Sequence, residues 1–86
     1  MKPKSPQHVA LGSAIRELRN NAGISQEYLA DRSDMHRTYV GGIERGERNA
    51  SFGNLLKLAD ALDVRLSVVV ARSEDLLAAS DPESSP

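Results

Sequence analysis

Arg37 and Thr38 stand side by side in the middle of the chain and offer side-chain chemistry that can read DNA bases. An arginine guanidinium can donate two hydrogen bonds to O6 and N7 of guanine, and a threonine can present its methyl group to thymine and its hydroxyl to a base edge. Amide, phenol and further guanidinium groups nearby are suited to phosphate oxygens. We therefore expect base contacts from Arg37, Thr38 and Gly42, where a missing side chain allows close approach, and phosphate contacts from Gln26, Tyr39, Arg48 and Asn49.

Catalytic and metal-binding groups are sparse. The 86 residues include no cysteine and only two histidines, His8 and His36, whose spacing does not form a metal-binding pair. His8 stands near the N-terminus, and His36 stands where a helix N-cap is expected. The sequence has no glycine-rich nucleotide loop, and no serine has a neighbouring base. The sequence therefore predicts neither an enzyme nor a bound metal or cofactor.

Glycine and serine residues mark the ends of the elements that must position these side chains. Gly23 and Gly46 can end helices, because a left-handed backbone carries no Cβ penalty at glycine. Ser25 and Ser51 can cap the helices that follow them. With the apolar spacing, these residues predict helices over 7–21, 26–33, 37–45 and 52–62, the last carrying an apolar stripe of Phe52, Leu55, Leu56, Ala59 and Leu62.

The second and third expected helices are short and are joined by three residues, which predicts a helix-turn-helix. Asp34 tolerates the left-handed backbone that such a sharp turn needs. Ala30 is small where the two helices would touch, and Val40 and Ile43 would fix the later helix to the body. The opposite face would then project Arg37, Thr38 and Gly42 into the major groove of DNA.

Residues 64–72 fit two patterns. Val64, Leu66, Val68 and Val70 alternate as in a strand, while Leu66, Val69 and Val70 also fit helical spacing. Three consecutive valines favour a strand, but a single strand after four helices would need a pairing partner. We expect a short fifth helix here, with a strand as the alternative.

The net charge of −1 conceals an uneven distribution. Residues 1–72 carry all 11 basic and eight of the acidic side chains, a net +3, whereas residues 73–86 carry four acidic and no basic ones. The ends are rich in proline, serine and charge, which is typical of disordered segments. We expect a disordered N-terminal arm over 1–6, a DNA-binding domain over 7–72 and an acidic tail over 73–86, with helix continuing to residue 79 left open.

The ordered set of motifs resembles the phage-repressor-like (Cro/C1, XRE) helix-turn-helix family over residues 9–72. The segments that carry the resemblance run from Gly23 to Asp31 and from Ile43 to Gly46. Within the family, residues 36–40, 42–46 and 48–49 are most similar to restriction–modification controller proteins. The chain departs from the family at Asp34, where glycine is usual, and in the valine-rich segment 68–70.

The resemblance implies an all-α, five-helix, lambda-repressor-like domain and an internal ion pair between Arg19 and Glu44. It also implies a sequence-specific regulator of transcription that binds double-stranded DNA. One recognition helix contacts few base pairs, so we expect a homodimer, formed through residues 50–79, on a palindromic operator with half-sites about one helical turn apart. Control of a restriction–modification operon is one form of this function.

A short regulator could activate by touching RNA polymerase, with Glu17, Glu27 or Asp31 as candidate contacts. The alternative function is an antitoxin-like module that binds a partner protein through the apolar segment 64–79 or the tail, with DNA binding secondary. The sequence predicts no membrane span and no signal peptide, so we expect a cytoplasmic, nucleoid-associated protein.

Overall fold

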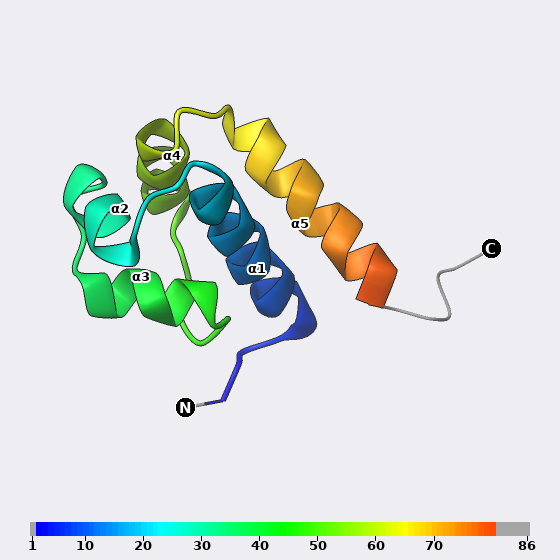
Figure 1. Cartoon of the computed structure of the whole chain (residues 1–86). Helices are drawn as coiled ribbons and strands as arrows, with labels where there is room; N and C mark the ends of the chain where they lie inside the picture. The colour runs from blue at the N-terminus through cyan, green and yellow to red at the C-terminus, as the bar shows by residue number, and fades with distance from the viewer. Residues whose placement is uncertain (1, 81–86) are drawn as a thin grey trace.

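Five α-helices make up the described part of the chain, residues 2–80 of a computed structural model. No strand occurs within these residues, which confirms the all-α expectation. Figure 1 shows α2 and α3 on one side of α1 and the long α5 on the other. The helices are α1 (Pro6–Asn21), α2 (Gln26–Arg32), α3 (Arg37–Glu44), α4 (Phe52–Ala61) and α5 (Leu66–Ser80).

Serine hydroxyls start three of the helices. Ser5, Ser25 and Ser51 each have extended backbone and accept a hydrogen bond from the backbone N–H three residues later. This bond satisfies one of the N–H groups that the first helical turn leaves without a partner. Capping by Ser25 and Ser51 was expected, whereas Ser5 falls in the segment predicted to be disordered.

A sharp turn joins α2 to α3. Asp34 has a φ of 57°, in the left-handed region, so the sequence prediction for this residue is confirmed. The preceding Ser33 is buried, and its hydroxyl donates to the Leu29 carbonyl oxygen at 2.6 Å. The turn therefore holds α2 and α3 as a helix-turn-helix without a glycine.

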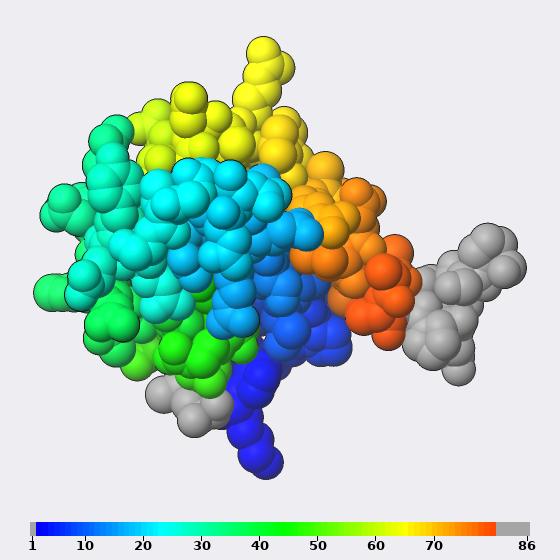
Figure 2. All heavy atoms as spheres, viewed as in Figure 1, coloured from blue at the N-terminus to red at the C-terminus, as the bar shows by residue number. Residues whose placement is uncertain are grey.

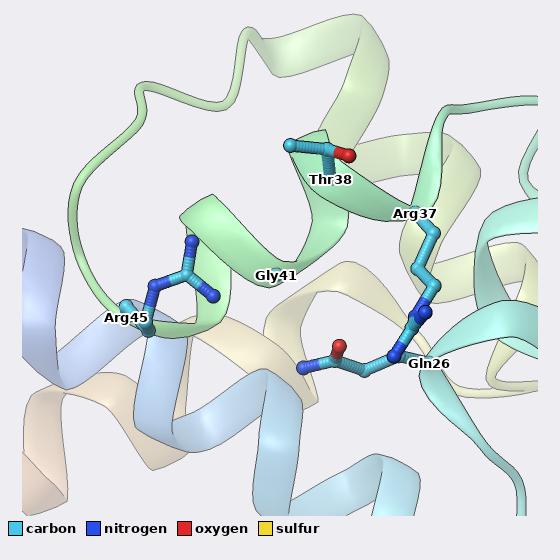
Figure 3. Close-up of a pocket in the computed structure, with 5 residues that line it drawn as sticks. All are labelled: Gln26, Arg37, Thr38, Gly41 and Arg45. Atoms are coloured by element: carbon cyan, nitrogen blue, oxygen red, sulfur yellow. The ribbon is translucent and has the colours of Figure 1, made fainter.

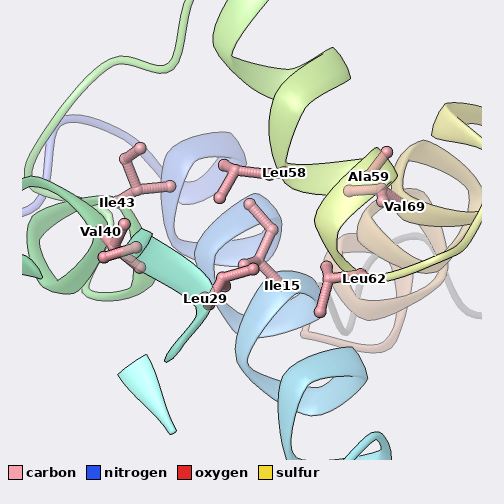
Figure 4. Close-up of a cluster of buried hydrophobic side chains, with 9 residues drawn as sticks. Ile15, Leu29, Val40, Ile43, Leu58, Ala59, Leu62 and Val69 are labelled. Atoms are coloured by element: carbon pink, nitrogen blue, oxygen red, sulfur yellow. The ribbon is translucent and has the colours of Figure 1, made fainter. Parts of the chain in front are cut away.

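The core lies where all five helices meet (Figure 4). Its largest side chains are almost completely buried and stabilise the fold through removal of apolar surface from water. They are Ile15 of α1, Leu29 of α2, Val40 and Ile43 of α3, Leu58 of α4 and Val69 of α5.

A glycine brings α1 and α3 into close contact. A Cβ atom on Gly12 would lie 2.2 Å from the backbone carbonyl oxygen of Ile43, far inside van der Waals distance. Only glycine allows the two backbones to approach this closely. This crossing fixes α3, and the side chains it presents, against the first helix.

The fifth helix expected after α4 is present, and the strand alternative for residues 64–72 is wrong. The helix runs without a break across residue 72, so the continuation toward residue 79 that the sequence left open occurs. Among the three valines, Val69 is buried in the core while Val68 and Val70 stay more than two-fifths exposed, as helical spacing requires. The Arg72 guanidinium donates two hydrogen bonds to the Glu17 carboxylate and so joins the middle of α5 to α1.

The N-terminal segment is more ordered than the sequence predicts. The backbone N–H of Lys4 donates to the Gly46 carbonyl oxygen at 2.8 Å, and α1 begins at Pro6, so residues 4–6 are not a disordered arm. The tail residues 81–86 lie outside the described residues. Within residues 2–80, no helix combines the length and apolar character needed to span a membrane.

Candidate nucleic-acid interface

One face of α3 and the start of α2 form a shallow open hollow. Figure 3 shows the five residues that line it. Spacing along α3 explains the grouping, because residues four and eight positions after Arg37 point to the same side of a helix. The lining residues are Gln26 of α2 and Arg37, Thr38, Gly41 and Arg45 of α3.

Arg37 stands at the first position of α3 with its guanidinium in solvent. Its side chain is 65% exposed, and its nearest acidic partner is Glu27, with an N–O distance of 3.7 Å and a side chain that is 75% exposed. Two exposed groups at this distance attract each other weakly in water. The guanidinium and the neighbouring, exposed Thr38 are therefore accessible to a ligand.

A buried carboxylate lies directly behind this face. Glu44, at the end of α3, is 3% exposed and accepts two hydrogen bonds from the Arg19 guanidinium, at 2.7 and 3.0 Å. Gln26 Nε2 donates to the same carboxylate at 2.8 Å. The ion pair expected from the sequence is present, and Gln26 joins it as a third member.

The pKa of Glu44 follows from these neighbours. Burial disfavours the charged form and by itself raises the pKa of this carboxyl. The hydrogen bonds from Arg19 and Gln26, with the positive charge of Arg19, outweigh burial and hold the pKa of Glu44 below its usual value. The carboxylate therefore stays charged and keeps the Arg19 and Gln26 side chains in place near neutral pH.

This arrangement presents Gln26 at the N-terminus of α2. One of its two amide N–H groups is bonded to Glu44, which fixes the side chain, and the second remains for a ligand. The Ser25 hydroxyl already accepts from the backbone N–H of Tyr28, and Glu27 places a negative charge in the same first turn. The amide of Gln26 is therefore the group at this terminus that suits a phosphate.

Gly42 does not face outward, contrary to the prediction. It is buried, and a Cβ on it would lie 2.5 Å from Cγ of Arg48. The preceding residue, Gly41, is also buried, but it lines the hollow. A rotation of about 100° per residue separates the two positions and turns Gly42 toward the loop after α3.

Tyr39 and Asn49 bond to each other across the loop that follows α3. The Tyr39 hydroxyl donates to the Asn49 carbonyl oxygen at 2.6 Å and accepts from Asn54 Nδ2 at 3.1 Å. A phenol has a single hydrogen to donate, so this hydroxyl has none left for a phosphate while the bond to Asn49 holds. The geometry gives Tyr39 the role of fixing the loop on which Asn49 and Arg48 stand.

Two residues of this face were missed from the sequence. Arg45 is half exposed and lines the hollow with its guanidinium near Glu47, at an N–O distance of 3.1 Å. Gly41 keeps the middle of the hollow open. The four-residue spacing from Arg37 through Gly41 to Arg45 could have identified both, because it defines one helix face.

Comparison with known proteins assigns this architecture to a family. A family model described as helix-turn-helix matches residues 15–69. The control protein C.SmaI of Serratia marcescens is 42% identical over 62 residues, which cover 72% of this chain and 74% of that protein. The control protein C.BamHI of Bacillus amyloliquefaciens is 46% identical over 55 residues, covering 63% of this chain and 68% of that protein.

Solved structures give the same result. The restriction–modification controller protein C.AhdI from Aeromonas hydrophila is 52% identical, with a TM-score of 0.71 over 72% of this chain and 94% of that one. The controller protein C.Esp1396I, solved as a tetramer in complex with its natural 35-base-pair operator, is 30% identical, with a TM-score of 0.79 over 86% of this chain and 97% of that one. These proteins are regulators and not enzymes.

Proposed function

This chain belongs to the helix-turn-helix family and is homologous to its restriction–modification control proteins, and from that premise we propose that it regulates the genes of a restriction–modification system by binding a palindromic operator. It is a DNA-binding regulator of transcription; the operator and the regulated genes are the proposal. The relatives favour this function over an antitoxin-like module. Its site of action would be the bacterial nucleoid, in the cytoplasm.

The observation that carries the proposal is the accessible face of α3. Arg37 and Thr38 are exposed at the N-terminal end of α3, the part of a recognition helix that reaches base edges in the major groove. We assign base contacts to these two residues. Arg45 lies two turns further along the same face, and we add it as a base or phosphate contact.

The phosphate contacts belong to the elements on either side of α3. Gln26 stands at the N-terminus of α2, and Arg48 and Asn49 stand on the loop after α3. Arg48 is exposed, and among the described residues it has no acidic partner. Contacts on both sides would fix the position of α3 in the groove without reading sequence.

Self-association is expected to use the apolar side chains that α4 and α5 leave in solvent. Phe52 is 68% exposed, Leu56 45% and Val68 42%, so the apolar stripe predicted on α4 is only partly buried in the core. A second subunit that covers these side chains removes apolar surface from water, and each Å² buried stabilises the dimer by about 25 cal/mol. We propose that residues 50–79 form the dimer interface, and that the DNA-binding unit extends beyond residue 72 along α5.

A contact with RNA polymerase is a further part of the proposal. Glu17 is bonded to Arg72, whereas Asp31 is exposed on α2 and has no ion pair within residues 2–80. Asp31 and the weakly paired Glu27 are therefore better candidates than Glu17. A Glu27→Gln/Asp31→Asn variant that binds DNA normally but loses activated transcription in a purified system would support this contact, and full activation would remove it.

Selection of bound duplexes from a random library tests the main proposal. We expect enrichment of a two-fold symmetric sequence whose half-sites are separated by about one helical turn, because two α3 helices of a dimer meet the same face of the DNA. Enrichment of no sequence would contradict specific binding. A methyltransferase gene and an endonuclease gene next to this one would support the assignment to a restriction–modification system.

A further inference from the structure

The N-terminal segment before α1 is held against the loop that follows α3. Besides the hydrogen bond from the Lys4 backbone to Gly46, a series of side-chain hydrogen bonds connects Ser5, His8 and Asn49. His8 Nδ1 lies 2.6 Å from the Ser5 hydroxyl, and His8 Nε2 donates to Asn49 Oδ1 at 2.5 Å. These contacts connect residues 41 positions apart and fix where residues 2–5 leave the body.

Contacts at the base of α1 reinforce this placement. A Cβ on Gly46 would lie 2.9 Å from Cα of Val9, so the first turn of α1 touches the end of α3 directly. Figure 2 shows the dark-blue segment projecting from the surface next to the green region that contains α3 and its loop. The segment therefore meets the body at Gly46, which follows Arg45 in the chain and precedes Arg48 by two residues.

The exposed side chains of this segment are basic. Lys2 and Lys4 are exposed, and neither forms an ion pair with any residue in the described range 2–80. The first turn of α1 contains no acidic residue that would repel an anion there. Pro3 stands between the lysines and restricts the backbone, which lowers the entropy lost when the segment is ordered on a ligand.

We propose that Lys2 and Lys4 form a second phosphate-binding element that extends the DNA contact beyond α3 and its loop. The ligand is the sugar–phosphate backbone of the duplex next to the bases that α3 reads. The lysines carry no base specificity, because an ammonium group meets phosphate oxygens as a point charge. This inference rests on the proposed function, since it requires that α3 faces DNA.

Salt dependence of binding tests the proposal. Each lost phosphate contact makes the slope of log K against log salt shallower by about 0.9, so Lys4→Gln should change the slope of a dimer by about 1.8 and Lys2→Gln/Lys4→Gln by about 3.6. Affinity at about 0.1 M salt should fall roughly tenfold or more for the single variant. The probes are the duplex recovered by library selection and a random duplex of equal length, and both should lose affinity equally.

Arg32→Gln is the matched control, because it removes one exposed basic side chain from the C-terminal end of α2, outside the proposed DNA contacts and outside residues 50–79. A Lys4→Gln variant with the slope and affinity of Arg32→Gln would overturn the proposal. Failure of the unmodified protein to bind either duplex would instead overturn the proposed function itself.

Insertion of two glycines between Lys4 and Ser5 tests the anchoring separately. The insertion keeps both charges but breaks the register between the Lys4–Gly46 bond and the Ser5 cap. We expect affinity to fall toward that of the double variant while the thermal midpoint stays near that of the unmodified protein. Unchanged affinity would contradict a placed binding element.

Discussion

The stem of the Arg48 side chain lies against Gly42, with Cγ of Arg48 2.5 Å from the point that a Cβ on residue 42 would occupy. The missing Cβ at residue 42 therefore makes room for the stem of an arginine six residues later. Because the stem is held on α3, the exposed guanidinium of Arg48 projects from a fixed base beside the recognition face.

Gly42→Ala should weaken DNA binding without unfolding the protein. The added methyl group displaces the Arg48 stem, while the helix gains up to about 1 kcal/mol of intrinsic propensity. We expect a nearly unchanged thermal midpoint and a slope of log K against log salt that is shallower by about 1.8 per dimer, because two phosphate contacts are lost. Anisotropy titrations over a range of salt measure both affinity and slope.

Gly41→Ala serves as the comparison. Its Cβ would meet the ends of two flexible side chains, with Arg45 Nη1 at 3.0 Å and Gln26 Oε1 at 3.5 Å, and both can move. This variant should be more stable than the unmodified protein by roughly 0.5–1 kcal/mol, because alanine has the higher helix propensity. If Gly42→Ala kept the salt slope of the unmodified protein, Arg48 would not be a phosphate contact.

Arg37→Ala should lower the affinity for the selected operator far more than the affinity for random DNA. A bidentate arginine–guanine contact contributes about 1–3 kcal/mol of discrimination at each half-site, whereas its nonspecific share is one charge. Arg32→Ala is the matched control, because Arg32 stands at the opposite end of α2 from Gln26. Its Cζ lies 5.6 Å from the centroid of the Tyr28 ring. Equal losses on both duplexes would mean that Arg37 does not read bases.

Local patterns were sufficient to predict the helix-turn-helix. Ser25 caps α2 through its own neighbours, and Asp34 needs only its own backbone freedom to make the turn. The ion pair of Arg19 and Glu44 came from the family resemblance, since nothing local links residues 25 positions apart. The sequence predicted a feature correctly where its determining contacts lie within one helical turn, or where the family resemblance implies the contact.

Contacts between distant residues explain what the sequence left open. The α5 segment was ambiguous because three valines suit a strand, and what holds it as a long helix is its packing on α1, including the bond of Arg72 to Glu17. Gly42 was misassigned because the residue that covers it comes from the following loop. The order of residues 4–6 depends on Gly46 and Asn49, more than 40 positions away.

Glu44→Gln should destabilise the fold, because it leaves the largely buried Arg19 guanidinium, whose side chain is 12% exposed, without its counter-charge. Removing one partner of a buried pair costs about 3 kcal/mol or more. Glu27→Gln, which breaks the exposed pair with Arg37, should cost less than about 1 kcal/mol. Urea titrations of both variants compare the free energies of unfolding, and similar losses would contradict the importance of burial.

Acid should weaken the unmodified protein through the same carboxylate. The pKa of Glu44 is lowered in the fold from the ordinary value of 4.5, so the unfolded chain takes up a proton first as the pH falls. The stabilisation is fully present above pH 4.5 and is lost as the pH falls through the lower pKa of the folded state. Glu44→Gln should show a flatter decline of unfolding free energy over this acidic range, and an equally steep one would exclude Glu44 as a source.

Phe52→Ser should shift the protein from dimer to monomer. The side chain is 68% exposed in the single chain, so its replacement removes little core packing, but a dimer built on residues 50–79 would cover it in both subunits. Burial of a phenylalanine contributes about 1.5–3 kcal/mol, and two copies predict a dimer dissociation constant at least roughly a hundredfold higher. Tyr28→Ser is the control, because Tyr28 is 47% exposed on α2 outside this region. Sedimentation over a concentration series measures the constant; if both variants dimerised like the unmodified protein, the interface would lie elsewhere.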